Sequence, residues 1–152
     1  MYVGYRYFDK VKTQALFPFG HGLSYTTFAF SAPRVDKQSG NTLAISINVK
    51  NTGSRAGSEV VQVYVSHSRP RINRPKKELK GFKKISLAAG EERLVQVVLD
   101  LKIATSFWDE YNDQWCSQSG KYVVEIGNSS AGHFQKTEFD VEKDCFWLGL
   151  GA

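Results

Sequence analysis

Apolar residues that alternate with polar or small ones constrain the fold of this chain more than any other feature of the sequence. In residues 43–50, LAISINVK, every second residue is a branched aliphatic one. This period of two places the aliphatic side chains on one face of an extended strand, whereas a helix would need a spacing of three or four residues. The segment is therefore predicted to be a strand with one buried face. Its inward residues are Leu43, Ile45, Ile47 and Val49.

The same alternation returns along the chain, and turn-forming residues separate its copies. Gly, Asn and Ser cluster between them, for example in NTGSRAGS at residues 51–58 and NSSAGH at residues 128–133. About seven short strands separated in this way predict an all-β fold, an immunoglobulin-like or fibronectin type III-like antiparallel two-sheet sandwich. One helix of a turn or two is expected at residues 100–105. The further inward-facing residues are Val61, Val63, Val65, Val95, Val97, Leu99, Tyr122, Val124 and Ile126.

The length and the charge of the chain limit its class. At 152 residues it is long enough for one domain with a core and short for two. No apolar run approaches the ~20 residues of a membrane-spanning helix, so no membrane partner is expected.

The net charge of +5 originates in residues 69–84, which hold eight basic residues and one acid, Glu78. Solvated edge strands commonly carry such a stretch, and a site for a polyanion or an acidic surface is the alternative. No nucleic-acid-binding motif accompanies it, so no nucleic acid partner is expected.

Residues suited to metal binding or nucleophilic catalysis are scattered along the sequence. The three histidines, His21, His67 and His133, stand singly among turns and strand ends, without the spacing of metal ligands. The segment GHGLSY at residues 20–25 lacks the third glycine of a dinucleotide-binding loop. We therefore expect no metal site and no cofactor.

The segment FWDEYNDQW at residues 107–115 contains a cluster of acids. Glycoside hydrolysis needs two carboxylates that face each other across the scissile bond. The acids of this segment are instead expected on one connecting loop with no facing element, where Asp and Asn serve turns. They are not predicted to be catalytic. The residues are Asp109, Glu110 and Asp113.

The aromatic rings of the same segment have two interpretations. Large rings pack in the core of a sandwich, which usually contains a Trp. Exposed rings can instead stack on sugars and other flat surfaces, which would make this segment a substrate-binding surface. The residues in question are Trp108, Tyr111 and Trp115.

The two cysteines, Cys116 and Cys145, flank the last predicted hairpin. Cys116 precedes its first strand and Cys145 follows its second, so both are expected at the same end of the hairpin. Two alternatives stay open: a disulfide, which requires Cα atoms about 4.4–6.8 Å apart, or two reduced thiols.

Six motifs run in a constant order along almost the whole chain and together resemble one known family. The chain resembles the C-terminal fibronectin type III-like domain of glycoside hydrolase family 3 β-glucosidases, preceded by the tail of their middle α/β sandwich domain. Its last residues, DCFWLGLGA, are similar to the ends of a fungal subgroup. The motifs are GYRYFD at 4–9, LFPFGHGLSYTTF at 16–28, VKNTGSRAGSEVVQVYV at 49–65, KELKGFKKISLAAGE at 77–91, FWDE with QW at 107–115, and SGKYVVEIGNSS at 119–130.

The resemblance implies three parts. Residues 1–25 would be the end of the upstream α/β domain and the interdomain connector, residues 26–142 the sandwich, and residues 143–152 a C-terminal tail. Because the connector motif lies so close to the first residue, the large upstream domains are expected to be absent from this chain. Connector aromatics would pack between the domains, and these are Phe17, Phe19 and Tyr25.

The resemblance also implies what the chain does. In this family the nucleophilic aspartate lies in an N-terminal barrel, typically in a Ser-Asp-Trp context that is missing here, and the acid/base glutamate lies in the middle domain. No catalytic residue can be assigned, so a non-catalytic accessory or structural module of a retaining β-glucosidase is implied, with the upstream catalytic domains as its partner. The alternative is a module that binds polysaccharide or lignin. A sequon at Asn128 permits glycosylation if the parent protein is secreted, and localisation stays open.

Overall fold

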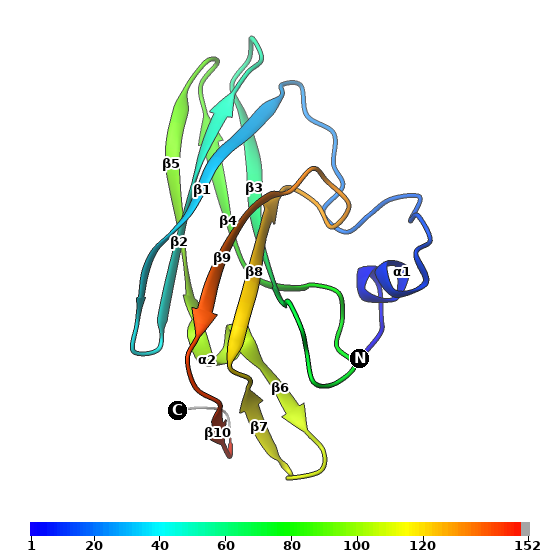
Figure 1. Cartoon of the computed structure of the whole chain (residues 1–152). Coiled ribbons are helices and arrows are strands. Elements are labelled where there is room, and N and C mark those ends of the chain that lie inside the picture. The colour runs from blue at the N-terminus through cyan, green and yellow to red at the C-terminus, as the bar shows by residue number, and fades with distance from the viewer. Residues whose placement is uncertain (150–152) are drawn as a thin grey trace.

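Two antiparallel sheets face each other, and Figure 1 shows them as the two layers of a sandwich. The structure is a computed structural model that describes residues 1–149, without the side chain of Lys37. The smaller layer has the strand order β1-β2-β5. Its strands are β1 (Phe28–Ser39), β2 (Thr42–Asn51) and β5 (Glu92–Asp100).

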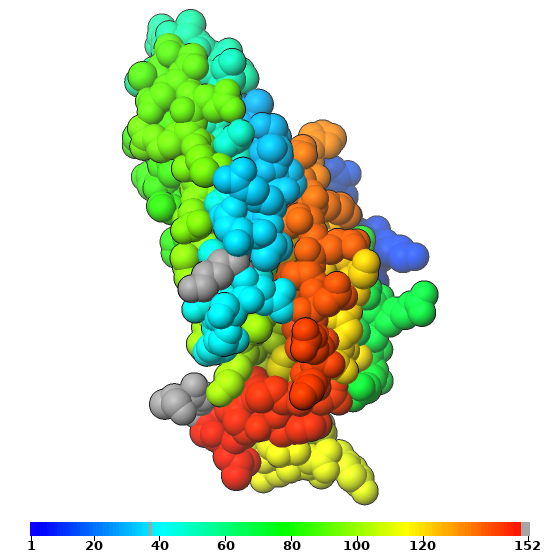
Figure 2. Space-filling view, turned by 60° about the vertical axis from the view of Figure 1, so that its left-hand side comes forward, coloured from blue at the N-terminus to red at the C-terminus, as the bar shows by residue number. Residues whose placement is uncertain are grey.

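The larger layer has four strands in the order β4-β3-β8-β9, so the two layers together confirm the predicted two-sheet sandwich. Strand β1 lies beside β9 at one side of the sandwich, as Figure 2 shows, and β4 lies beside β5 at the other. The strands of the larger layer are β3 (Gly57–His67), β4 (Glu78–Leu87), β8 (Gly120–Gly127) and β9 (Gln135–Val141).

The core between the layers is built from the alternating residues. Every inward-facing residue predicted from the alternation is buried, with an exposed fraction of 7% or less. Strand β4 approaches β5 closely because it carries Gly81, where an added Cβ would lie 2.4 Å from the Leu99 Cδ2 atom. A side chain at this position would displace the core, so the close approach requires glycine.

The helix predicted at residues 100–105 is confirmed as α2 (Leu101–Thr105). It begins directly after β5 because the Asp100 carboxylate accepts a hydrogen bond from the Ile103 amide at 2.9 Å, which satisfies one of the free N–H groups of the first turn. Neither helix in the described part of the chain is long and apolar enough to cross a membrane.

A third sheet, with the strand order β10-β7-β6, follows α2. The segment at residues 107–115, expected as one connecting loop, contributes β6 (Ser106–Asp109) and β7 (Gln114–Ser117). The predicted tail contributes β10 (Cys145–Trp147), and residues 150–152 of that tail lie outside the described residues. The loop prediction is wrong because strands of three or four residues are too short to show a period of two.

The helix α1 (Tyr5–Val11) was not predicted, because seven residues are too few to show a helical period clearly. None of these residues is buried. The helix lies against the outer face of the larger layer (Figure 1). There the Tyr5 ring meets the ring of Tyr64 on β3 edge-on, with centroids 5.6 Å apart. Tyr64 is completely buried although it points away from the core, so the helix and its neighbours cover it.

Residues 12–27 connect α1 to β1 without regular secondary structure, and we call them the connector. Its backbone is fixed to the sandwich, because the Ser130 amide donates to the Phe19 carbonyl at 2.8 Å. Gly20 has a φ of +83°, and an added Cβ would lie 2.2 Å from the Gln62 Nε2 atom. This turn therefore requires glycine.

Candidate functional site

The three tryptophans form a row across the third sheet. Trp108 on β6 pairs with Trp115 on β7, and Trp115 pairs with Trp147 on β10. Directly paired residues of antiparallel strands project from the same face of a sheet. The Trp108 and Trp115 rings meet edge-on, with centroids 5.4 Å apart and planes at 81°. All the tryptophans of the chain therefore gather on one face.

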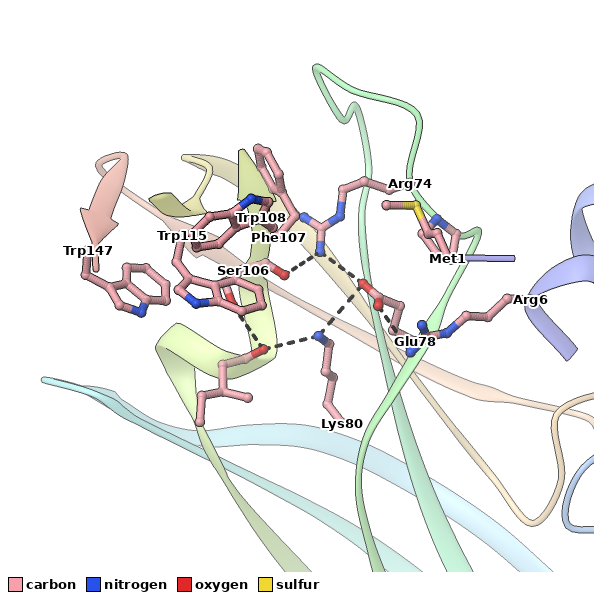
Figure 3. Close-up of a pocket in the computed structure, with 12 residues that line it drawn as sticks. Met1, Arg6, Arg74, Glu78, Lys80, Ser106, Phe107, Trp108, Trp115 and Trp147 are labelled. Atoms are coloured by element: carbon pink, nitrogen blue, oxygen red, sulfur yellow. Dashed lines mark hydrogen bonds and ion pairs between the residues drawn. The ribbon is translucent and has the colours of Figure 1, made fainter. Parts of the chain in front are cut away.

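A cavity of about 500 Å³ lies beside this row, and we call it the tryptophan cavity (Figure 3). Its apolar lining includes the three tryptophans together with Phe107 and Ile103, and Met1 and Pro75 also border the cavity. Figure 3 shows charged side chains on the other side of the cavity. A volume of this size is within the range of small-molecule sites in proteins.

The charged wall is organised around Glu78, the first residue of β4. Its carboxylate forms ion pairs with Arg74 at 3.1 Å, with Arg6 of α1 at 3.3 Å and with Lys80 at 3.8 Å. Three cations thus share one carboxylate, and no other acid lines the cavity among the described residues. The wall carries an excess of positive charge.

Arg74 is the most firmly held of these cations. Its guanidinium donates to the Thr105 carbonyl at 3.0 Å and to the Ser106 carbonyl at 3.2 Å, and it lies over the Phe107 ring at 5.2 Å. Only 6% of its side chain is exposed. Arg74 therefore joins the loop before β4 to the end of α2 and the start of β6.

Lys80 lies beside Arg74, with 13% of its side chain exposed. Its ammonium group donates to the Ile103 carbonyl at 3.1 Å. Burial lowers the pKa of Lys80, and the nearby Glu78 carboxylate opposes this shift. The cause is the loss of hydration of the charged form, which a buried lysine feels most strongly.

The structure brings two of the three predicted binding residues together. Trp108, with 40% of its surface exposed, and the half-buried Trp115 both line the tryptophan cavity. Tyr111 does not, because it lies in the turn between β6 and β7, where it is 95% exposed. No local pattern indicated that Trp147 would join the row, because its short strand β10 pairs with β7, which lies far earlier in the chain.

Comparisons with known proteins agree with this architecture. The sequence model of the family described as the fibronectin type III-like domain matches residues 59–130. A curated relative, the probable beta-glucosidase I of Aspergillus fumigatus, is 44% identical over 99% of this chain and 19% of its own length.

Two solved structures are similar over nearly the whole chain. The beta-glucosidase of Kluyveromyces marxianus superimposes with a TM-score of 0.93 and 47% identity, covering 98% of this chain and 18% of that protein. The beta-glucosidase 3B of Thermotoga neapolitana gives a TM-score of 0.89 and 36% identity, covering 97% of this chain and 20% of that protein.

The chain belongs to the fibronectin type III-like domains of glycoside hydrolase family 3 β-glucosidases. It spans about a fifth of the length of the curated relatives that it matches. The chain is therefore an accessory module of such enzymes, and the tryptophan cavity belongs to that module.

Both cysteines are free thiols in the structure, which corresponds to the second of the two alternatives. Cys145 pairs with Ser117, and Phe146 pairs with Cys116, so the two cysteines are offset by one position on neighbouring strands. Their side chains consequently project from opposite faces of the sheet. Burial raises the pKa of the Cys116 thiol, which further reduces its reactivity.

Within the part of the chain that the structure describes, no three His, Cys, Asp or Glu side chains lie together in a way that could hold a metal ion.

The segment that leads into β10 is held by Asp144. Its carboxylate accepts hydrogen bonds from the Arg71 guanidinium at 2.5 Å and from the Ser119 amide at 2.7 Å. These bonds, chiefly the one from Arg71, lower the pKa of Asp144 to about 2. The ionised carboxylate therefore ties the third strand of the tryptophan row to the loop before β4.

We predict that Asp144→Asn lowers the urea midpoint of unfolding at pH 7 and that this difference shrinks as the pH falls. The folded pKa of Asp144 is about 2, below the unfolded value of about 3.9. Its contribution is therefore complete above about pH 5 and is lost between there and pH 2. Urea unfolding at several pH values measures this, with Asp113→Asn in the β6–β7 turn as control. An equal loss at pH 7 and pH 3 would contradict the account.

Proposed function

We propose that this module is a non-catalytic part of a family 3 β-glucosidase that stabilises, or helps shape, the catalytic domains preceding it in the same polypeptide. Those domains would cleave terminal β-D-glucosyl residues. The observation that carries the proposal is an exposed apolar face formed by the connector and α1.

The connector exposes five large apolar side chains, and a large exposed apolar patch on a protein surface marks an interaction site. Its large side chains project outward although its backbone is fixed to the sandwich. This is the pattern expected of a surface that another domain covers, and it supports an interdomain role for the aromatic residues predicted from the sequence. The exposed fractions are 88% for Leu16, 73% for Phe17, 55% for Phe19, 96% for Leu23 and 92% for Tyr25.

A second cavity, of about 310 Å³, lies between α1 and the connector. It is bordered by Tyr5 and Phe8 of the helix and by Phe17 and Phe19 of the connector. Val11 of α1 is also exposed, at 44%. The apolar face thus continues across both segments and has a hollow into which a side chain of a neighbouring domain can insert.

We predict that Phe17→Ser combined with Leu23→Ser lowers the melting temperature of the complete β-glucosidase polypeptide by roughly 2 °C or more. The two side chains contribute apolar area to the proposed interface, so their loss weakens the contact between domains. The same double substitution in the isolated module should reduce self-association, because the exposed apolar face is then smaller. Calorimetry of the complete protein and sedimentation of the module measure these effects.

Val98→Ser is the matched control, since Val98 is also an exposed apolar residue, at 61%. It lies on β5 of the smaller layer, whereas α1 packs against the larger layer. If the complete protein melts at the same temperature with and without the connector substitutions, the interdomain role is wrong.

A polysaccharide or lignin surface is the second partner that we propose for this module. Full exposure of Tyr111 at the tip of the β6–β7 turn and partial exposure of Trp108 support it, together with the basic stretch at residues 69–84. The perpendicular arrangement of Trp108 and Trp115 argues against a flat platform for a polymer. Tyr111 would therefore supply most of the stacking.

We predict that Tyr111→Ala reduces cosedimentation of the isolated module with insoluble cellulose or lignin, while Tyr25→Ala does not. Tyr25 is the matched control because it is 92% exposed, against 95% for Tyr111. Turnover of p-nitrophenyl-β-glucoside, measured alongside, should be absent in both variants. A wild-type module that sediments with neither material would eliminate this second partner.

A further inference from the structure

The tryptophan cavity combines two properties that select a ligand. One wall is made of indole rings and the other holds three cations around a single carboxylate (Figure 3). An aromatic ring is suited to the first wall, because ring pairs stabilise each other beyond the area that they bury. A negative charge is suited to the second.

Arg6 is the cation of this wall with the fewest contacts among the described residues. Arg74 donates to two carbonyls and to Glu78, and Lys80 donates to the Ile103 carbonyl. Arg6 is different, because within the described residues it donates no hydrogen bond and forms only the 3.3 Å ion pair with Glu78. Its side chain is 34% exposed. Arg6 can therefore offer a two-pronged contact to a carboxylate without giving up an existing bond.

The acceptors near the cavity already face donors, apart from the Ser106 hydroxyl oxygen, which lines the cavity and only donates. The carbonyls of Thr105 and Ser106 accept from Arg74, the carbonyl of Ile103 accepts from Lys80, and the Glu78 carboxylate faces three cations. A neutral sugar has several hydroxyl donors that would need such acceptors. A carboxylate needs only donors, and Arg6 supplies them. A free donor and few free acceptors around the cavity therefore favour an anion over a neutral sugar.

We propose that the tryptophan cavity binds a small aromatic carboxylate, with its ring against the tryptophan row and its carboxylate on Arg6. The cavity volume of about 500 Å³ leaves room for one substituted ring. The cavity shares the helix α1 with the proposed interdomain face through Arg6, but no connector residue lines it.

The chain itself provides the reporter for this test. It has only three tryptophans, all in the row, so the three indole N–H signals of a ¹H–¹⁵N NMR spectrum all come from the cavity. The probes are benzoate, the neutral benzyl alcohol, the non-aromatic anion glucuronate, and glucose. We expect benzoate to shift the indole signals saturably and to bind about tenfold more tightly than benzyl alcohol, as one charge-assisted contact implies.

Arg6→Gln should weaken benzoate binding about tenfold, the effect of one lost charge-assisted contact, and leave benzyl alcohol unchanged. Arg6→Lys keeps the positive charge and should retain part of the benzoate affinity. This variant separates the loss of charge from a local structural change caused by replacing Arg6. Arg93→Gln is the matched control, because Arg93 is an exposed arginine of β5 paired with Glu91.

Three results would overturn the proposal. The first is the absence of saturable shifts with benzoate. The second is equal binding of benzoate and benzyl alcohol, or a benzoate affinity that Arg6→Gln leaves intact. The third is stronger binding of glucuronate or glucose, which would assign the cavity to carbohydrate.

Discussion

An ion pair between the buried Lys77 and the partly exposed Asp9 holds the N-terminal helix on the sandwich, and much of the surface of the module depends on it. The two charged groups lie 2.6 Å apart, with 5% of the Lys77 side chain and 20% of the Asp9 side chain exposed. The ammonium also lies 5.2 Å from the ring centroid of Phe134. Without Asp9 the buried Lys77 ammonium would lack a counter-charge, which is destabilising. The helix α1 therefore has to stay where Asp9 can reach Lys77.

Glu78, the residue after Lys77, connects α1 to the tryptophan cavity. Glu78 binds Arg6 of the same helix, and on its other side it binds Arg74, which contacts the start of β6. Two neighbouring residues before and at the start of β4 thus position both surfaces of the module. Lys77 fixes the helix beside the apolar connector, and Glu78 gathers the cations of the tryptophan cavity.

The long strands could be predicted from the sequence, whereas the site could not. A period of two over eight residues, as in LAISINVK, is set by burial on one face and is visible locally. The helix α1 and strands β6, β7 and β10 are short and take their stability from distant partners such as Tyr64 and Trp115. Trp108 and Trp115 could be named as candidates from the sequence. Trp147 joins them only through the pairing of β10 with β7, and Arg6 reaches Glu78 only because α1 packs on the sandwich, so neither contact is apparent from local sequence. The one-residue offset that separates Cys116 from Cys145 is likewise a property of strand register.

Hydrogen exchange in the wild-type chain and in Lys77→Met tests most directly whether the Lys77–Asp9 ion pair holds α1 on the sandwich. The signals to follow are the α1 amides and the amide of Leu79, which donates to the Tyr5 hydroxyl at 2.8 Å. The account predicts that these amides are protected in the wild type and lose protection in Lys77→Met, while the β2 amides of Ile45 and Ile47 keep theirs. Exchange of the α1 amides at the unfolded rate in the wild type, or unchanged protection in Lys77→Met, would contradict it.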